Sequence, residues 1–352
     1  MLRRLVKDFQ GDVLAVPGRL VALVFLIVLL LIPLFFTNSP FVLRTLIVAN
    51  LFVIFAVSWD LLSGYTGQIN FGHALFFGVA AYASALLNLR LGMPIWATIP
   101  LGALAGVVAG VVVCLPALRL RGPYLSLVTL AFPLILLGIV FTFTDFTGGE
   151  YGLSRLDRIH TSRTVIYYIS LAIMVVSVFI MWKLTDAKSS FVRTGLIFHA
   201  IREDEITARA SGINTIRYKL LAFAVAGFFA GLAGAFYAHF LMIAGPSNLA
   251  LTLSFQVIIW TVFGGIASIY GPVVGVYVLY PLMELVLRDI SEYRFLVFGG
   301  IVVVMLLFMP EGIAVWARDK IERECPRCKL PNMAFRKTCR ACDTRLYEHT
   351  TD

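Results

Sequence analysis

The chain has 352 residues, of which 60% are hydrophobic and only 14% are charged. Soluble domains carry about 25% charged residues because their surface faces water, so this composition excludes an ordinary water-soluble protein. The formal net charge is +9. In a membrane protein such an excess belongs to the cytoplasmic loops, and we therefore do not attribute it to nucleic-acid binding.

The first apolar run begins near Leu20, after several basic residues, and continues as LVALVFLIVLLLIPLFF. It is longer than the apolar part of a secretory signal, which has about 7–15 residues, and no small-residue cleavage site follows it. We expect a retained first helix, preceded by a cytoplasmic N-terminal segment over residues 1–19.

Nine further apolar stretches follow along the chain. A helix needs about 20 apolar residues to cross the hydrocarbon core, so the sequence predicts an all-α polytopic membrane protein with about ten transmembrane helices, and eight as the fallback. The eighth and ninth are short and are separated by Gly271-Pro272, so they could be broken or re-entrant. The expected spans are 20–37, 44–62, 72–90, 95–117, 124–143, 165–184, 219–243, 253–270, 272–288 and 294–310.

Basic residues predict the orientation, because cytoplasmic loops of membrane proteins carry an excess of Lys and Arg. With ten crossings, the basic N-terminus, the pair Arg119 and Arg121 and the basic loop 183–219 all fall on the cytoplasmic side. The charge-balanced loop 144–164 falls outside. Both termini are therefore predicted to be cytoplasmic.

Residues 63–74, SGYTGQINFGHA, are rich in glycine and neutral polar side chains at a helix end. Small residues let helices approach closely, and non-helical backbone at membrane depth is either buried in protein or lines a cavity. Two interpretations stay open: tight helix packing, or a substrate pathway lined by Gln68, Asn70 and His73. Asp60 poses the same choice, since a carboxylate in or near a span is either functional or paired at the helix end.

Residues 199–214, HAIREDEITARASGIN, predict a short amphipathic helix on the cytoplasmic side. Glu205 and Arg209 are spaced i,i+4, and Gly212 is placed to end the helix. Such a helix is either a solvated loop element or docks into the groove of a partner. The small or apolar residues available for contact are Ala200, Ile201, Ile206 and Ala208.

Several runs of the sequence resemble the LivM-type permeases of branched-chain amino acid ABC importers. They are WDLLSGYTGQINFGHALFFG at 59–78, GPYLSLVTLA at 122–131, TGG at 147–149, the stretch from AIREDE to FYA at 200–238, VFGGIASIYGP at 262–272 and MPEG at 309–312. The resemblance covers roughly residues 40–315, with the motifs in the expected order. Asp60 departs from the pattern, because the family commonly has an uncharged polar residue there.

The resemblance implies a permease subunit that moves branched-chain, hydrophobic amino acids across the inner (plasma) membrane of a bacterial or archaeal cell. It implies as partners a homologous LivH-type permease, two ABC ATPase subunits and an extracytoplasmic substrate-binding protein, besides the lipid bilayer. By position, coupling to the ATPases falls on the segment 199–214. The coupling residues are then Ala200, Ile201, Arg202, Glu203, Asp204, Glu205, Ala208 and Gly212.

None of the seven lysines follows a glycine, so the chain has no phosphate-binding P-loop and ATP is expected to be used by partner subunits only. No catalytic arrangement of serine, cysteine or histidine can be argued from spacing, and we expect no enzyme. Two alternatives remain open. The same architecture could import urea, short amides or another small carboxylate, or the chain could be a zinc-responsive membrane sensor.

The chain becomes polar after Ala317, and four of its five cysteines follow as Cys325, Cys328, Cys339 and Cys342. Two CxxC pairs can bind one tetrahedral zinc ion, so the sequence predicts a zinc-ribbon-like cytoplasmic module over 318–352, after a transmembrane permease domain over 20–317. Two disulfides are the rival interpretation, which the reducing cytoplasm disfavours. A closed four-cysteine site has no open position, so the zinc should be structural.

Overall fold

The computed structural model describes residues 17–36, 39–117, 123–186, 193–287, 293–326, 331–333, 338–339, 342 and 344–345. The first half of the chain forms α2 (Pro17–Phe36), α3 (Pro40–Asp60), the π-helical turn η1 (Leu61–Tyr65), α4 (Ala74–Leu91), α5 (Ile95–Ala117), α6 (Pro123–Thr142), α7 (Thr144–Thr147), η2 (Gly149–Tyr151), β1 (Leu153–Ser154) and α8 (Arg163–Thr185). The second half forms α9 (Thr194–Glu203), α10 (Glu205–Ala210), α11 (Thr215–Leu241), β2 (Ile243–Ala244), η3 (Pro246–Leu249), α12 (Leu251–Gly264), α13 (Tyr270–Pro281), η4 (Leu282–Val286), α14 (Arg294–Phe308), α15 (Ile313–Ile321), β3 (Glu322–Glu324) and β4 (Pro331–Met333).

Ten apolar helices occupy the ten expected spans, which confirms the all-α polytopic membrane architecture. Within the described ranges, six are long and apolar enough to cross a membrane: Pro40–Tyr65, Ala74–Leu91, Ile95–Pro116, Tyr124–Thr142, Arg163–Thr185 and Thr215–Leu241. The other four are shorter: Val21–Phe36, Leu251–Gly264, Tyr270–Val286 and Leu296–Met305. The number of complete crossings therefore stays a prediction.

The break between α12 and α13 lies earlier than expected. The sequence pointed to Gly271-Pro272, but the chain leaves α12 at Gly265 and re-enters a helix at Tyr270. Gly271 and Pro272 thus belong to the first turn of α13, where a proline is tolerated because its missing N–H has no partner inside the helix. The turn between the two helices is instead the run Gly265–Ile269.

The helix α3 lies in the core of the molecule, and all of its residues from Thr45 to Asp60 are buried. A polar group at its centre links it to two neighbours: the Asn50 side-chain amide donates to Ser170 of α8 at 2.9 Å, and the Tyr277 hydroxyl of α13 donates to the Asn50 oxygen. Polar side chains inside a membrane helix are expected to be partnered in this way, since hydrocarbon offers them no alternative.

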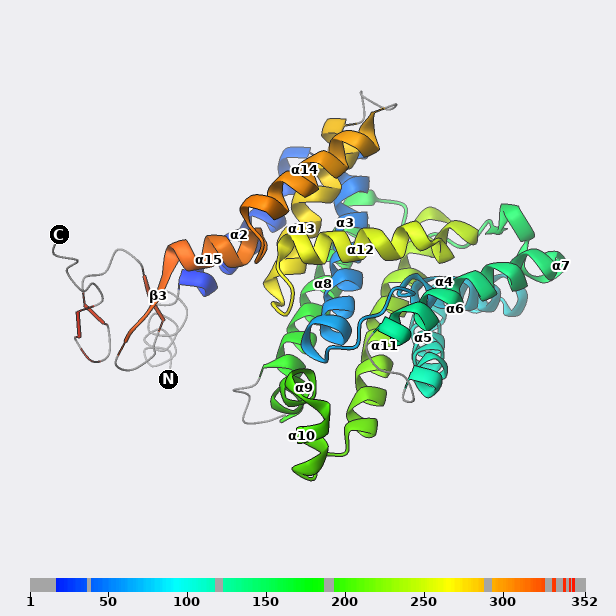
Figure 1. Ribbon diagram of the computed structural model, residues 1–352. Helices are drawn as coiled ribbons and strands as arrows, with labels where there is room; N and C mark the ends of the chain where they lie inside the picture. The colour runs from blue at the N-terminus through cyan, green and yellow to red at the C-terminus, as the bar shows by residue number, and fades with distance from the viewer. Residues whose placement is uncertain are drawn as a thin grey trace, which may run out of the picture.

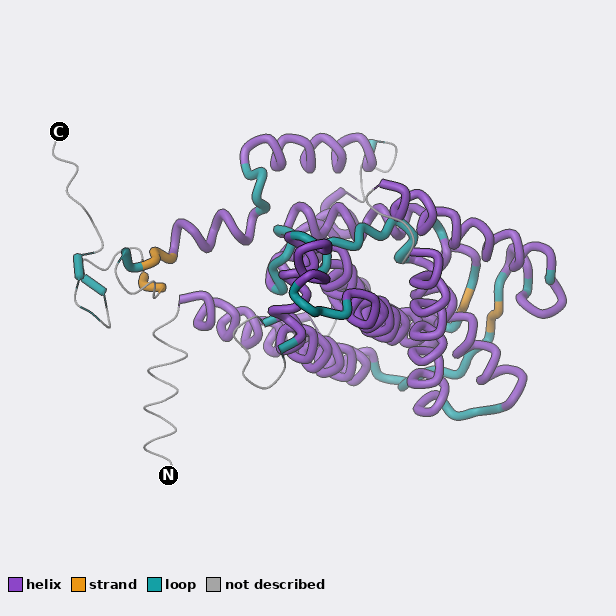
Figure 2. Tube along the Cα trace, turned by 60° about the horizontal axis from the view of Figure 1, so that its bottom comes forward, coloured by secondary structure: helices purple, strands orange, loops and turns teal. Residues whose placement is uncertain are grey.

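The helices α4, α5 and α11 pack closely through small residues. A Cβ atom added to Gly106 of α5 would lie 2.3 Å from the backbone oxygen of Gly227 in α11, so only glycine allows this approach. Figures 1 and 2 show that the molecule is mainly helical. The only strands among the described residues are two short antiparallel pairs. One pair, β1 with β2, joins the loop after α7 to the end of α11.

The helix α11 connects the end of the molecule that carries α10 to the end that carries β1 and β2. This helix has 27 residues and is about 40 Å long, at 1.5 Å per residue. Its N-terminus lies beside α10 and its C-terminus beside β2, which pairs with β1. Figure 1 accordingly shows α9 and α10 at the bottom, α7 at the right, and α15 leading into β3 at the left.

Candidate functional site

The expected coupling segment is not one helix but two. The helix α9 ends at Glu203, and Asp204 adopts an extended conformation before α10 begins. Its carboxylate accepts the Ile206 backbone N–H at 2.8 Å and the Thr207 hydroxyl at 2.6 Å, as an N-cap does. The Thr207 hydroxyl, together with the backbone N–H groups of Ile206 and Thr207, holds the pKa of Asp204 below its ordinary value. The expectation of a continuous helix was therefore wrong, because this aspartate caps a new one.

The helix α10 ends where the sequence predicts, next to Gly212. Gly212 has φ +85°, a conformation that glycine adopts without strain. Its N–H donates to the Arg209 oxygen at 3.0 Å, and the Ile213 N–H donates to the Ala208 oxygen at 3.1 Å. These two bonds form a Schellman motif, which satisfies the last carbonyl groups of the helix. Gly212 thus ends the helix as predicted.

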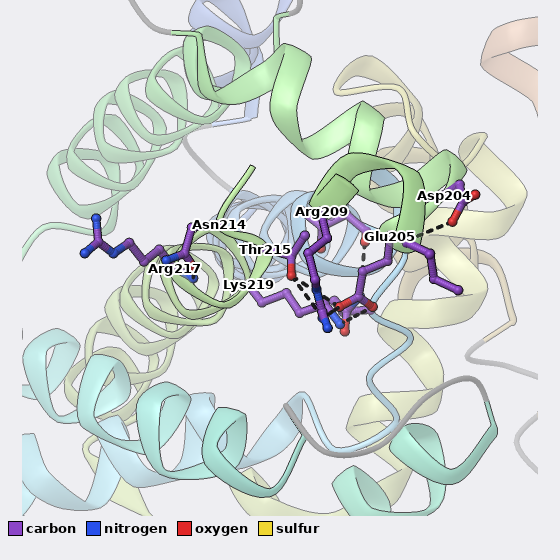
Figure 3. A network of polar contacts seen from close by, with 10 residues as sticks. Asp204, Glu205, Arg209, Asn214, Thr215, Arg217 and Lys219 are labelled. Atoms are coloured by element: carbon purple, nitrogen blue, oxygen red, sulfur yellow. Dashed lines mark hydrogen bonds and ion pairs between the residues drawn. The ribbon is translucent and has the colours of Figure 1, made fainter. Parts of the chain in front are cut away.

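Glu205 is the centre of a charged network that joins α10 to α11 (Figure 3). Its carboxylate accepts from Arg209 at 2.9 Å, which confirms the expected i,i+4 pair, and from Lys219 at 2.7 Å. The Thr215 hydroxyl also donates to it at 3.4 Å. Lys219 is only 4% exposed and Glu205 19%, whereas Arg209 is 55% exposed. The bond to Lys219 is therefore the buried part of the network.

Some of the residues expected to contact a partner are buried inside this chain, and others are exposed on the outward face of the segment. Ile201 and Ala208 are 4% and 5% exposed and pack inside this chain. Ile206 is 64% exposed, and Arg202 and Glu203 are also exposed beside it. The outward surface of the segment is thus a charged helix end with one large apolar side chain. Its contact with an ATPase stays a prediction.

The candidate pathway residues Asn70 and His73 are buried in one hydrogen-bonded cluster. The Nε2 atom of His73 lies 2.9 Å from the Ser58 hydroxyl, and its Nδ1 atom lies 3.4 Å from the Asn70 side-chain nitrogen. The Asn70 side-chain oxygen accepts the Gly72 N–H at 2.8 Å, and the Trp59 indole N–H donates to the Asn70 backbone oxygen at 2.7 Å. In this chain the cluster fixes the non-helical connection between η1 and α4.

Gln68 lies in the same connection and is 8% exposed. Its side-chain amide donates to the Thr66 backbone oxygen at 3.3 Å, while the Ser63 hydroxyl donates to the Gln68 backbone oxygen at 3.2 Å. Gln68, Asn70 and His73 are therefore brought together, but all three are enclosed by their own chain. A role in lining the substrate pathway stays a prediction.

Asp60 is fully buried at the end of α3 and contacts a distant part of the chain. Its Oδ1 atom accepts the backbone N–H of Ala267 at 2.8 Å, in the turn between α12 and α13. The other oxygen, Oδ2, has no hydrogen-bond partner among the described residues. No sequence pattern linked these positions, because 207 residues separate them.

Three of the four tail cysteines form a cluster, and Cys328 lies outside the described residues. The sulfur atoms of Cys325, Cys339 and Cys342 lie within 4.8 Å of one another, with 3.5 Å between those of Cys325 and Cys342. Four thiolates at 2.3 Å from a tetrahedral zinc ion are about 3.8 Å apart, so this arrangement fits three ligands of such a site. The Asn332 side-chain nitrogen lies 3.6 Å from the Cys339 sulfur, the kind of donor that orients a metal ligand.

The helix α15 continues across the boundary expected between residues 317 and 318. Within it, Arg318 donates to the Tyr270 hydroxyl at 2.8 Å, so the start of the tail contacts α13. The fifth cysteine, Cys114, is fully buried in α5, away from the tail, as expected of a small apolar side chain.

Comparison with known proteins identifies relatives for most of the chain. Residues 41–307 match the family described as "Branched-chain amino acid transport system / permease component". The chain is 29% identical to the high-affinity branched-chain amino acid transport system permease protein LivM of Salmonella typhimurium over 308 residues, 79% of this chain and 71% of that protein. For LivM of Escherichia coli the identity is 29% over 313 residues, 81% and 71% of the two chains. For LivH of Escherichia coli it is 24% over 298 residues, 77% and 93%.

Proposed function

Because this chain belongs to the branched-chain amino acid transport permease family, we propose that it forms part of the pathway by which leucine, isoleucine and valine are imported. The observation that carries the proposal is the family match over residues 41–307, which runs from α3 into α14 and includes the segment 199–214. In this proposal a LivH-type permease completes the pathway. Two ABC ATPase subunits supply the energy, and an extracytoplasmic binding protein delivers the amino acid.

Uptake by the complete importer in proteoliposomes tests this function. With ATP inside, we expect vesicles that contain this chain, its partner permease, the ATPases and the binding protein to accumulate leucine, isoleucine and valine. Urea, short amides and small carboxylates serve as competitors. ATP-dependent uptake of one of these in place of the branched-chain amino acids would favour the alternative cargo. A chain that copurifies with no ATPase and changes state with zinc would be a sensor.

We further propose that both termini are cytoplasmic, because every basic cluster then lies on the same side of the membrane. The arrangement of α11 supports this, since its 27 residues separate the loop 144–164 from the basic segment 199–214. Reporter fusions at residues 155 and 330 should report opposite sides, with residue 155 outside. Two fusions on the same side would mean that the number of crossings is wrong by an odd number.

For the tail we propose one structural zinc ion, held by Cys325, Cys339, Cys342 and, as the fourth ligand, Cys328. The support is the close grouping of the first three sulfur atoms and the CxxC spacing. Zinc bound by four thiolates would hold β3, β4 and the cysteine-bearing turns together, in a segment with little apolar core of its own.

A further inference from the structure

The turn between α12 and α13 is a non-helical connection over residues 265–269. The helix α12 has 14 residues and α13 continues through η4 to Val286, so they are about 20 and 25 Å long and shorter than the hydrocarbon core of about 30 Å. Between them Gly265 has φ +119° and Ala267 has φ +58°, which is unfavourable for an alanine.

Two side chains, one at the end of α3 and one in η1, form hydrogen bonds with this turn. Asp60 accepts the N–H of Ala267 at 2.8 Å, and the Tyr65 hydroxyl accepts the N–H of Ile269 at 3.2 Å. A Cβ atom added to Gly64 would lie 2.9 Å from the Ala267 nitrogen, so the backbone of η1 is also pressed against the turn. The bond to Asp60 stabilises the strained conformation of Ala267.

The same end of α3 contacts α9. The ring of Tyr65 packs edge-to-face on the ring of His199, with 5.4 Å between the centroids. A Cβ atom on Gly67 would lie 3.4 Å from Cγ of Arg202, so the chain after η1 rests on this side chain. Tyr65 thus contacts both α9 and the α12–α13 turn.

We propose that Tyr65 is a positioning residue that transmits movement of α9 to the α12–α13 turn, so that the turn changes position with the ATPase cycle. The proposal rests on the proposed function and on the predicted coupling of the segment 199–214 to an ATPase subunit. Its physical basis is that Tyr65 of η1 accepts a hydrogen bond from this turn while its ring packs on α9. Movement of α9 therefore strains the bond to Ile269.

The test compares Tyr65→Phe with Tyr82→Phe in the assembled importer. Tyr65→Phe keeps the ring on His199 but removes the acceptor of the Ile269 N–H. Tyr82 is a matched control, because it is 7% exposed against 8% for Tyr65 and its hydroxyl has no hydrogen-bond partner among the described residues. Four quantities are measured: the amino acid imported per ATP hydrolysed, hydrogen exchange of the Ile269 amide, assembly with the ATPases, and basal ATP hydrolysis.

We expect Tyr65→Phe to lower the amino acid imported per ATP by about two- to thirtyfold, the range over which mutations modulate coupling. The Ile269 amide should exchange about two- to tenfold faster, as loss of one hydrogen bond predicts. Assembly with the ATPases and their basal hydrolysis should not change, and Tyr82→Phe should leave all four quantities unaltered.

Equal coupling in the wild type and in Tyr65→Phe would overturn the inference while leaving the proposed function intact. A parallel loss of assembled complex, uptake and hydrolysis would also overturn it, because that pattern indicates a merely structural role. A wild-type importer that hydrolyses ATP without any uptake would instead overturn the proposed function on which the inference depends.

Discussion

Replacing Glu205 by leucine should destabilise the junction between α10 and α11 by about 3–5 kcal/mol, the usual cost of removing one partner of a buried ion pair. The reason is Lys219, which is 4% exposed and would keep a buried ammonium group without its carboxylate 2.7 Å away. Amides of residues 204–219 should then exchange faster with solvent, and import should fall because α10 no longer holds its place on α11.

Two variants separate this explanation from general damage to the segment. Arg209→Gln removes the exposed member of the same network, and exposed i,i+4 pairs contribute only about 0.3–0.5 kcal/mol. The double variant Glu205→Leu with Lys219→Met replaces the buried pair by apolar side chains, so stability should recover to near the wild-type value. If the amides of residues 204–219 exchange as slowly in the single variant Glu205→Leu as in the wild type, the buried pair does not hold the junction.

Local sequence patterns predicted the parts of the fold that depend on neighbouring residues. The ten apolar stretches became helices because apolar length decides whether a segment suits the membrane. The pair Glu205–Arg209 and the helix end at Gly212 were also predictable, since both follow from spacing within one or two turns. The break at Asp204 was missed, although aspartate is a strong N-cap residue, because the flanking residues also suit a continuous helix.

Contacts between distant segments could not be predicted in the same way. Lys219 faces Glu205 only because the turn at Gly212 directs α11 back past α10, and a spacing of 14 residues carries no pattern. The bond from Ala267 to Asp60 spans 207 residues, so the sequence showed a costly carboxylate without its partner. The same holds for Gln68, Asn70 and His73: composition singled them out, and folding enclosed them within one chain.

Removing zinc should unfold the tail while the helical body from α2 to α14 stays folded. Structural zinc supplies about 10–16 kcal/mol in zinc-finger peptides at neutral pH, more than a short segment with almost no apolar core provides by itself. Purified chain should contain one zinc per molecule. After chelation, the segment from residue 322 onward should become sensitive to protease, and the thermal unfolding of the membrane part should not change.

Cysteine substitutions then decide which thiolates hold the ion. Cys325→Ser, Cys328→Ser, Cys339→Ser and Cys342→Ser should each lower the zinc content strongly, because tetrahedral coordination needs all four ligands. Cys114→Ser is the matched control: this cysteine is buried in α5, and its loss should leave one zinc per chain. Truncation after Ile321 should preserve α15 with its bond from Arg318 to Tyr270, and with it membrane insertion. Protein without zinc whose cysteines react with alkylating agents only after reduction would contain disulfides, and a cytoplasmic C-terminus would then be untenable.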